Sequence, residues 1–211
     1  MKNLGIIGAG NVGSELARLA IAAGYVVSIA NSRGPETLED LISNLGPQAS
    51  AATVEAAAAS ADLVVVSIPV NGYAALPKDA FEGKIVIDTG NYYPEYFGTI
   101  PELEDGSITT AELLQSELLG SRVVKAFSHL GAADLAASAK PGESSGRIAL
   151  LLAGDDKDAK SRVEGLMSDF GFDFVDAGSL AEGWRFQRDQ PATGVMLGVA
   201  EITAALANAK K

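Results

Sequence analysis

The fold of this chain is decided by a stretch near its beginning, Leu4-Gly5-Ile6-Ile7-Gly8-Ala9-Gly10-Asn11-Val12-Gly13. The short apolar run is typical of a buried strand, the glycines predict a tight turn, and the alanine-rich residues 14–23 predict a helix. Gly8 permits the turn, Gly10 lets the backbone approach a pyrophosphate, and Gly13 lets the helix pack closely on the strand. Free N–H groups at the helix start then face phosphates, so the stretch predicts a dinucleotide-binding βαβ unit.

The residues after the next strand indicate which dinucleotide is bound. Gly24 is expected to end the helix, and residues 25–30 read as the second strand. NAD sites usually place an acid at the end of this strand, but here the chain has Asn31, Ser32 and Arg33. Arg33 can form charge-assisted bonds with a 2′-phosphate, and Ser32 can add a donor. We therefore expect NADP(H), the alternative being that Arg33 is a solvated loop residue.

Composition limits the other possibilities. The 211 residues are 47% hydrophobic with a net charge of −11, which predicts one domain over residues 1–211 and disfavours nucleic acid and anionic membranes as partners. No apolar stretch is long enough for a membrane span and no secretory signal is evident, so a cytoplasmic location is expected. Cysteine is absent and His129 is the single histidine, so no metal site is expected.

Three further apolar runs, at residues 62–68, 84–88 and 122–127, predict buried parallel strands. In such sheets ligands bind beyond the carboxyl ends of the strands. At or beyond the ends of the first two runs we therefore expect cofactor contacts from Ser67, Ile68, Pro69, Val70, Thr89, Gly90 and Asn91, and after the third run His129 near the same edge.

The remaining segments complete the predicted fold. Helices are expected over 35–45, 54–60, 109–119, 158–170 and 194–209, and further strands over 48–53, 147–153 and 172–176. Residues 94–106 read as a covering loop, and the Ser/Gly/Pro-rich residues 137–146 as a boundary. The fold class is α/β: a doubly wound, mostly parallel Rossmann sheet with a short C-terminal βαβ extension from about residue 147 and a final helix.

The expected final helix is apolar around most of its circumference and carries small residues four apart, Gly194 and Gly198. Such a helix must be buried, either against its own domain or against a second copy of the chain. The small residues favour a homodimer contact.

Several motifs together resemble the coenzyme F420-dependent NADP oxidoreductases, a family related to the cytosolic reductase domains of the STEAP metalloreductases. They are the N-terminal glycine motif, Asn31-Ser32-Arg33, Val66-Ser67-Ile68-Pro69, Arg122-Val123-Val124-Lys125-Ala126-Phe127, Ala153-Gly154-Asp155-Asp156 and Asp176-Ala177-Gly178-Ser179-Leu180. The resemblance implies NADPH bound at residues 8–13, 31–33 and 68–70. It also implies hydride exchange with F420 or a flavin-like ring stacked on the nicotinamide.

Three functions remain open from the sequence. The first is an NADPH-dependent oxidoreductase with a flavin-like or deazaflavin acceptor, which needs rings held face to face more than a protein acid. The second is a reductase of a small carbonyl or imine, with His129 as general acid; otherwise His129 is a hydrogen-bonded structural residue. The third is a non-catalytic NADPH sensor whose loop at residues 92–97 orders on binding.

Overall fold

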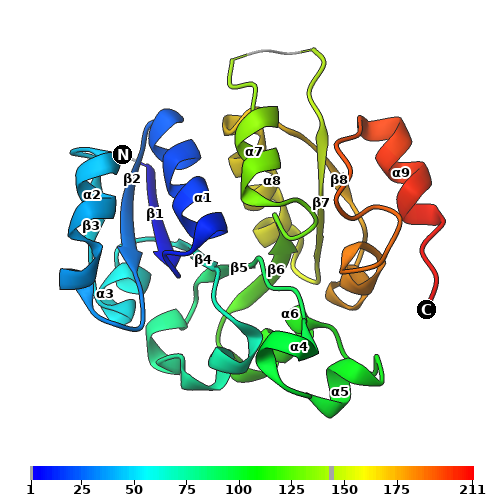
Figure 1. Ribbon diagram of the computed structural model, residues 1–211, viewed down its shortest axis with the longest axis horizontal. Helices are drawn as coiled ribbons and strands as arrows, with labels where there is room; N and C mark the ends of the chain where they lie inside the picture. The colour runs from blue at the N-terminus through cyan, green and yellow to red at the C-terminus, as the bar shows by residue number, and fades with distance from the viewer. Residues whose placement is uncertain (1, 143–144) are drawn as a thin grey trace.

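The chain is built around one sheet of eight strands with helices on both faces (Figure 1). The structure is a computed structural model that describes residues 2–142 and 145–211. The strand order is β3-β2-β1-β4-β5-β6-β7-β8. The strands are β1 Lys2–Ile7, β2 Tyr25–Ala30, β3 Ala49–Ala51, β4 Leu63–Val66, β5 Ile85–Asp88, β6 Arg122–Ala126, β7 Ala149–Gly154 and β8 Asp173–Asp176. The α/β class and the doubly wound sheet expected from the sequence are confirmed.

The directions of the strands explain where a ligand can lie. Neighbouring strands are parallel throughout, except that β7 runs antiparallel to β6. The chain reverses its direction of travel across the sheet between β1 and β4, which places a crevice beyond their carboxyl ends. Every residue of β4 and β5 is buried, as their continuous apolar runs predict for strands covered on both faces.

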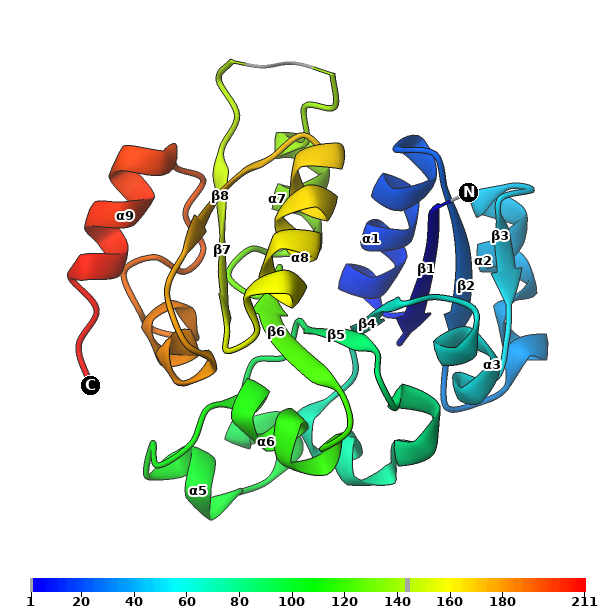
Figure 2. The ribbon, with the colours of Figure 1, turned by 180° about the vertical axis from the view of Figure 1, so that it is seen from behind.

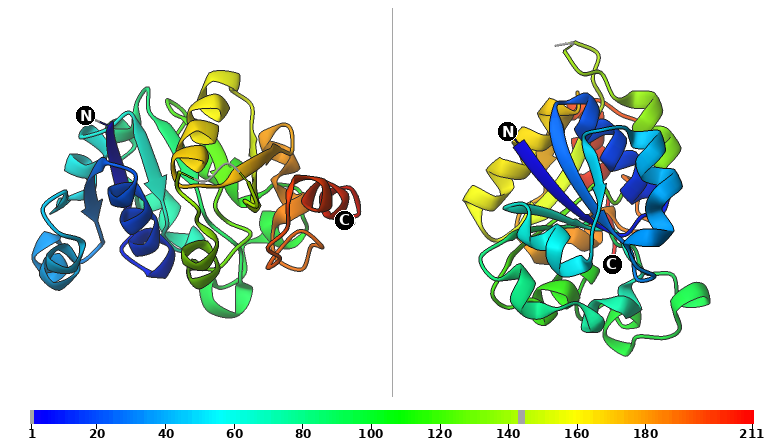
Figure 3. Two further views of the ribbon diagram at one scale, coloured as in Figure 1. Left: turned by 90° about the horizontal axis from the view of Figure 1, so that it is seen from above. Right: turned by 90° about the vertical axis from the view of Figure 1, so that its left-hand side faces the viewer.

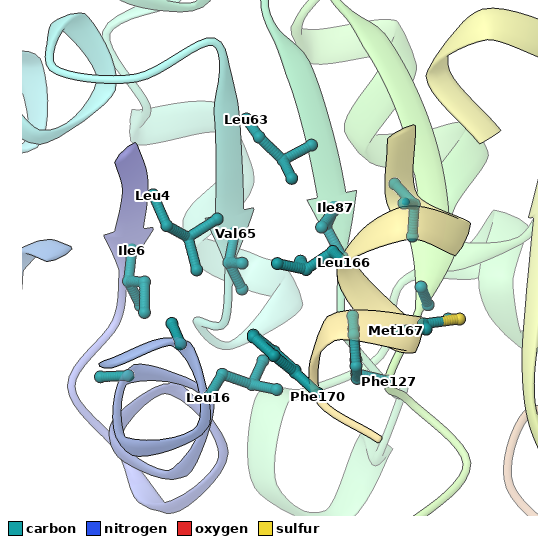
Figure 4. Close-up of a cluster of buried hydrophobic side chains, with 14 of the residues drawn as sticks. Leu4, Ile6, Leu16, Leu63, Val65, Ile87, Phe127, Leu166, Met167 and Phe170 are labelled. Atoms are coloured by element: carbon teal, nitrogen blue, oxygen red, sulfur yellow. The ribbon is translucent and has the colours of Figure 1, made fainter. Parts of the chain in front are cut away.

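Four helices cover the first face of the sheet. They are α1 Asn11–Ala22, α2 Glu39–Leu45 with the preceding 3-10 turn η1 Pro35–Leu38, α7 Ala132–Ser138 and α8 Lys157–Asp169. Figure 2 shows α8 against β6 and β7. In the core, Leu16 of α1 and Phe170 beyond α8 meet over Ile6 and Val65 (Figure 4). Burial of such side chains contributes roughly 1.5–3 kcal/mol each.

The second face is covered by shorter elements. They are α3 Val54–Ala59, η2 Val70–Ala75, η3 Lys78–Phe81, α4 Pro94–Phe97, α5 Pro101–Glu104, α6 Thr110–Glu117, η4 Leu180–Phe186 and α9 Val199–Ala207. A capping box begins α6, since the Thr109 side chain accepts from the Glu112 N–H and the Glu112 carboxylate accepts from the Thr109 N–H. Two of these short helices, α4 and α5, lie within the expected covering loop and each begins at a proline.

The final helix is shorter than expected from the sequence. Gly194 has φ of +74° and lies in a loop, while α9 begins at Val199 with Gly198 as its N-cap. The expectation that both glycines lie on one helix face was therefore wrong. Ile202 and Leu206 of α9 pack on the chain's own sheet, in the cluster that includes Leu151 of β7.

The expected C-terminal extension is confirmed, because β7, α8 and β8 form a βαβ unit that continues the sheet. Residues 143 and 144 of the expected boundary at 137–146 lie outside the described residues. The single-domain organisation over residues 1–211 stays a prediction. The left-hand view of Figure 3 shows β1 and α9 well separated across the molecule. Within the described ranges, every helix is too short or too polar to cross a membrane.

Candidate functional site

The glycine turn between β1 and α1 has the geometry that a dinucleotide requires. Gly8 adopts φ of +114°, and a side chain there would collide with the carbonyl oxygen of Ser67. A side chain at Gly13 would collide with the Gly8 carbonyl oxygen, so helix and strand approach as closely as predicted. Gly10 has open space where a β-carbon would point. An anion can therefore approach this backbone at the start of α1.

The loop after β2 exposes a cation beside this turn. The Asn31 side chain accepts from the Arg33 N–H at 2.9 Å and donates to Thr37 Oγ1 at 2.9 Å, so it shapes the loop. Arg33 is exposed and forms no ion pair with any residue that the structure describes. A guanidinium of this kind can bind a phosphate in bidentate fashion.

A cavity of about 560 Å³ joins the turn, this loop and the end of β4. The predicted residues that line it are Gly8, Ala9, Gly10, Asn31, Ser32, Arg33, Ser67, Ile68 and Pro69. Val54 and Leu76 add apolar surface suited to a flat base. Of the other predicted contacts, Val70 is buried in the core at the start of η2 and Gly13 lies under the turn, and neither lines this cavity.

A second cavity of about 490 Å³ continues from the first, because Gly10, Ser67, Ile68 and Pro69 line both. Its remaining walls are Asn11, Val12, Thr89, Gly90, Asn91, Tyr93, Phe97, Phe127, Ser128, His129, Leu130, Gly131, Thr193 and Gly194. The loops after β1, β4, β5 and β6 thus meet at one edge of the sheet, as expected for parallel strands. Thr193 and Gly194 had not been assigned to a site from the sequence.

Several buried polar atoms in the walls of the second cavity have no hydrogen-bond partner among the described residues. Asn91 Oδ1, Ser128 Oγ and both ring nitrogens of His129 are buried and form no hydrogen bond with the described residues. Leaving such groups unpaired costs about 1–3 kcal/mol each, so native proteins rarely accumulate them. These atoms have almost no accessible surface, so a ligand could pair with them only after the side chains of Asn91, Ser128 or His129 turned toward the cavity that they line. The lining as a whole combines polar residues with the aromatic side chains of Tyr93 and Phe97, which fits a nicotinamide ring beside a planar acceptor.

His129 lies deep in the wall of this cavity. Only 1% of its surface is exposed, and burial lowers its pKa from 6.5 to about 4. The imidazole is therefore neutral at pH 7. Its ring meets Phe186 edge-on with centroids 6.5 Å apart, and its carbonyl accepts from the Gly194 N–H at 2.7 Å.

The turn that presents His129 begins with a strained residue. Phe127 has φ of +57°, a backbone conformation that bulky side chains rarely adopt. It is buried, and its ring packs against Phe170 at a centroid distance of 5.9 Å. Packing thus holds Phe127 in the left-handed region, which turns the chain sharply and places Ser128 and His129 at the cavity. Strain of this kind is often found at functional sites.

A buried ion pair supports the loop after β5. Lys125 Nζ lies 3.4 Å from Asp88 Oδ2, and both side chains are fully buried. The same ammonium donates to the Gly90 carbonyl at 2.6 Å, while Asp88 Oδ1 accepts from the Gly90 N–H at 2.8 Å. Asn91 then donates to the Ser128 carbonyl at 2.6 Å. The pair therefore fixes the loop that carries Asn91 and, through it, the loop that carries His129.

Two further side chains complete this network. Tyr73 donates to Asp88 Oδ1 at 2.6 Å, and Thr110 donates to Asp88 Oδ2 at 3.1 Å. Burial lowers the pKa of Lys125 and raises that of Tyr73. The sequence reasoning missed the network, although a lysine inside an otherwise apolar strand was a usable signal.

Residues 3–92 match the family model of the coenzyme F420-dependent NADP oxidoreductases. This range contains β1 to β5 and therefore the glycine turn, the Arg33 loop and the end of β5.

Three relatives extend the likeness over most of the chain. Metalloreductase STEAP3 from Rattus norvegicus is 31% identical over 180 residues, 84% of this chain; the chain spans about a third of that relative's length. The solved structure of the hypothetical protein SMa0349 from Sinorhizobium meliloti is 35% identical, with TM-score 0.81 and coverage of 93% of this chain and 95% of that one. A proposed F420-dependent NADP reductase from Arthrobacter sp. FB24 shares the fold at 24% identity, with TM-score 0.71 and coverage of 87% of each chain.

Proposed function

Because the chain belongs to the family of coenzyme F420-dependent NADP oxidoreductases, we propose that it exchanges hydride between NADP(H) and a flavin-like or deazaflavin (F420) ring. NADP(H) as cofactor is supported by the family model and the curated relative. The cofactor, the acceptor and the residues that hold them are all parts of this proposal.

The nucleotide half of the proposed site consists of the turn and the Arg33 loop. Residues 8–13 form the pyrophosphate site, in which free backbone N–H groups at the start of α1 bind the phosphates and Gly8 and Gly13 shape the turn. Arg33 and Ser32 hold the 2′-phosphate, and Asn31 keeps their loop in shape. Residues 67–69 lie at the junction of the two cavities, where the nucleotide half meets the reacting half.

The observation that carries the proposal is the second cavity, which continues from the nucleotide half and has both polar and flat aromatic lining residues. Asn91 and Ser128 line it from the loops after β5 and β6, and His129 closes the wall beside them. Tyr93 and Phe97 supply flat apolar surface opposite a planar compound. When bound, NADPH supplies the hydride, and the protein's part is to orient two rings and exclude water.

An NADPH oxidation screen tests this function. We expect F420 or free flavins to be reduced, and quinones, ferric chelates and simple carbonyls to react more slowly. Efficient reduction of carbonyls or imines alone would replace the proposal with a small-molecule reductase. If the protein binds NADPH tightly but none of these acceptors leads to NADPH oxidation, it would instead be a sensor, with the loop at residues 92–97 as its responsive element.

The substitution His129→Gln separates the two enzymatic functions. If the acceptor is a flavin-like ring, His129 only shapes the pocket, and the single-turnover rate with saturating NADPH should fall by less than about tenfold. A general acid for a carbonyl or imine would cost about 10²–10⁴-fold when removed. A loss above a hundredfold with unchanged NADPH affinity would therefore contradict our mechanism.

The pKa of His129 adds a second readout to that experiment. Since burial lowers it to about 4, the rate should not titrate near pH 6.5 through this residue. The folded state binds fewer protons than the unfolded state, so stability is lost as the pH falls from 6.5 through 4. Unfolding of the parent protein should show this loss and His129→Gln should lack it, which urea titrations at several pH values can measure.

We also propose that the protein is a homodimer through the outer face of α9. That face presents Val199, Ala200, Ala204 and Ala207, all of them exposed and uncharged. Sedimentation should give a dimer for the parent and a monomer for Ala204→Arg. Ser168→Arg, an exposed change on α8, serves as the control and should remain a dimer. A parent that sediments as a monomer at high concentration would end this proposal.

A further inference from the structure

The walls of the second cavity carry no positive charge. None of its lining residues is a lysine or arginine, and its single titratable imidazole, His129, is neutral at pH 7. The segments that form the walls also contain long stretches without lysine or arginine. No lysine or arginine occurs at positions 85–121, 126–139 or 189–209. The nucleotide half differs, because there the unpaired Arg33 faces the cavity.

Arg188, which packs on a residue of the cavity wall, is already paired with acids. Arg188 Nη1 lies 2.7 and 2.9 Å from the two carboxylate oxygens of Glu95, and its Nε lies 3.4 Å from Asp189 Oδ2. Its guanidinium also packs on the ring of Tyr93 at 5.1 Å, and Tyr93 lines the cavity. Two carboxylates around one cation leave this rim negative.

A further acid lies beside Arg188. Glu104 lines a small hollow together with Arg188 and Asp189. The whole chain carries a net charge of −11. Summed charges of one sign create surface potentials of several kT that raise or lower the local concentration of ionic ligands. A ligand with a phosphate or carboxylate tail is repelled at this mouth.

We propose that the acceptor half of the site selects an uncharged planar redox ring of the riboflavin type, in preference to rings that carry anionic tails. This inference rests on the proposed function. The reaction balances as one hydride and one proton: the C4–H bond of NADPH breaks, an N–H bond forms at N5 of the isoalloxazine, and N1 takes a proton from water. NADPH is oxidised to NADP⁺, and the flavin is reduced by two electrons.

Riboflavin and FMN make a matched pair for the test, because they share one ring and differ by a phosphate. Binding of each to the NADP⁺-saturated protein can be followed by quenching of flavin fluorescence. At about 20 mM salt we expect riboflavin to bind at least about tenfold more tightly than FMN. The ratio should shrink as salt is added, since screening weakens the repulsion. F420 should bind more weakly than riboflavin for the same reason.

A variant with one fewer carboxylate at the rim tests whether electrostatic repulsion causes the preference for riboflavin. Glu95→Gln removes one carboxylate and leaves Arg188 with a free side, so FMN affinity should rise about fivefold while riboflavin affinity changes by less than about twofold. Glu117→Gln is the matched control. It makes the same change in net charge on α6, where Glu117 pairs with Lys78 of η3. It should raise FMN affinity by less than about twofold.

The outcomes separate this inference from the proposed function. FMN or F420 binding as tightly as riboflavin would overturn the inference, whether or not they are reduced. Absence of binding by all three rings would also overturn it. Preferential binding of riboflavin without NADPH oxidation would support the charge selection and contradict the hydride transfer.

Discussion

Replacing Lys125 by methionine is expected to lower the free energy of unfolding by about 3–5 kcal/mol. The substitution leaves the fully buried Asp88 carboxylate without its cation, and it removes the donor that the Gly90 carbonyl accepts from. Loss of one partner from a buried ion pair costs far more than the net value of the pair, because the remaining charge stays desolvated. Urea unfolding of the parent and the variant measures the difference directly.

Lys78→Met is the matched control for this prediction. It makes the same chemical change at an exposed ion pair, in which Lys78 Nζ lies 2.7 Å from Glu117. Exposed pairs contribute only about 0.2–1 kcal/mol, so this variant should remain close to the parent. Similar losses for the two variants would show that the buried pair has no special role. A second readout is the acceptor KM, which should rise in Lys125→Met because the loop carrying Asn91 loses its support.

The contrast between these lysines shows which features of the site could be predicted from sequence. The strand-end residues were found because a local pattern, an apolar run followed by small polar residues, places them at one edge of a parallel sheet. The Asp88–Lys125 pair has no local pattern. Its members are 37 positions apart, and only the neighbouring positions of β5 and β6 bring them together.

The same distinction between local patterns and long-range contacts explains why the final helix differs from its prediction. The apolar pattern over residues 194–209 predicts one long helix, but helix length also depends on backbone conformation. Gly194 adopts φ of +74° and donates its N–H to the His129 carbonyl, a contact between residues far apart in the chain. The Glu201 carboxylate accepts from the Gly198 N–H at 3.0 Å, which starts α9 at the next residue. Tertiary contacts therefore set the boundary that periodicity alone could not locate.

The role of residues 183–188 also depended on the structure. Gly183 packs against the aliphatic part of Lys125, so a side chain there would press on the buried lysine. Phe186 meets His129, and Arg188 pairs with Glu95 across 93 positions of sequence. This segment therefore supports the second cavity from behind and at its rim, a role that its composition did not indicate.

Replacing Arg33, the cation of the nucleotide half, is expected to affect the binding of NADPH and of NADH very differently. Arg33→Ala should weaken NADPH binding by roughly 10- to 150-fold, because one charge-assisted contact is worth about 1.5–3 kcal/mol. NADH lacks the 2′-phosphate, so its affinity should stay nearly the same. Arg33 is suited to this role because it is exposed beside the first cavity and has no carboxylate partner among the described residues.

The control for Arg33→Ala should remove a cation without touching the loop after β2. Arg18→Ala does so on α1, where the guanidinium lies 3.2 Å from Glu15 and outside both cavities. Titration of each variant with NADPH and NADH, followed by nucleotide fluorescence, gives the four affinities needed. Because the lost contact is ionic, the parent's preference for NADPH should also fall with added salt, and that of Arg33→Ala should fall less. Equal losses of NADPH and NADH in Arg33→Ala would show that Arg33 supports the loop and does not recognise the 2′-phosphate.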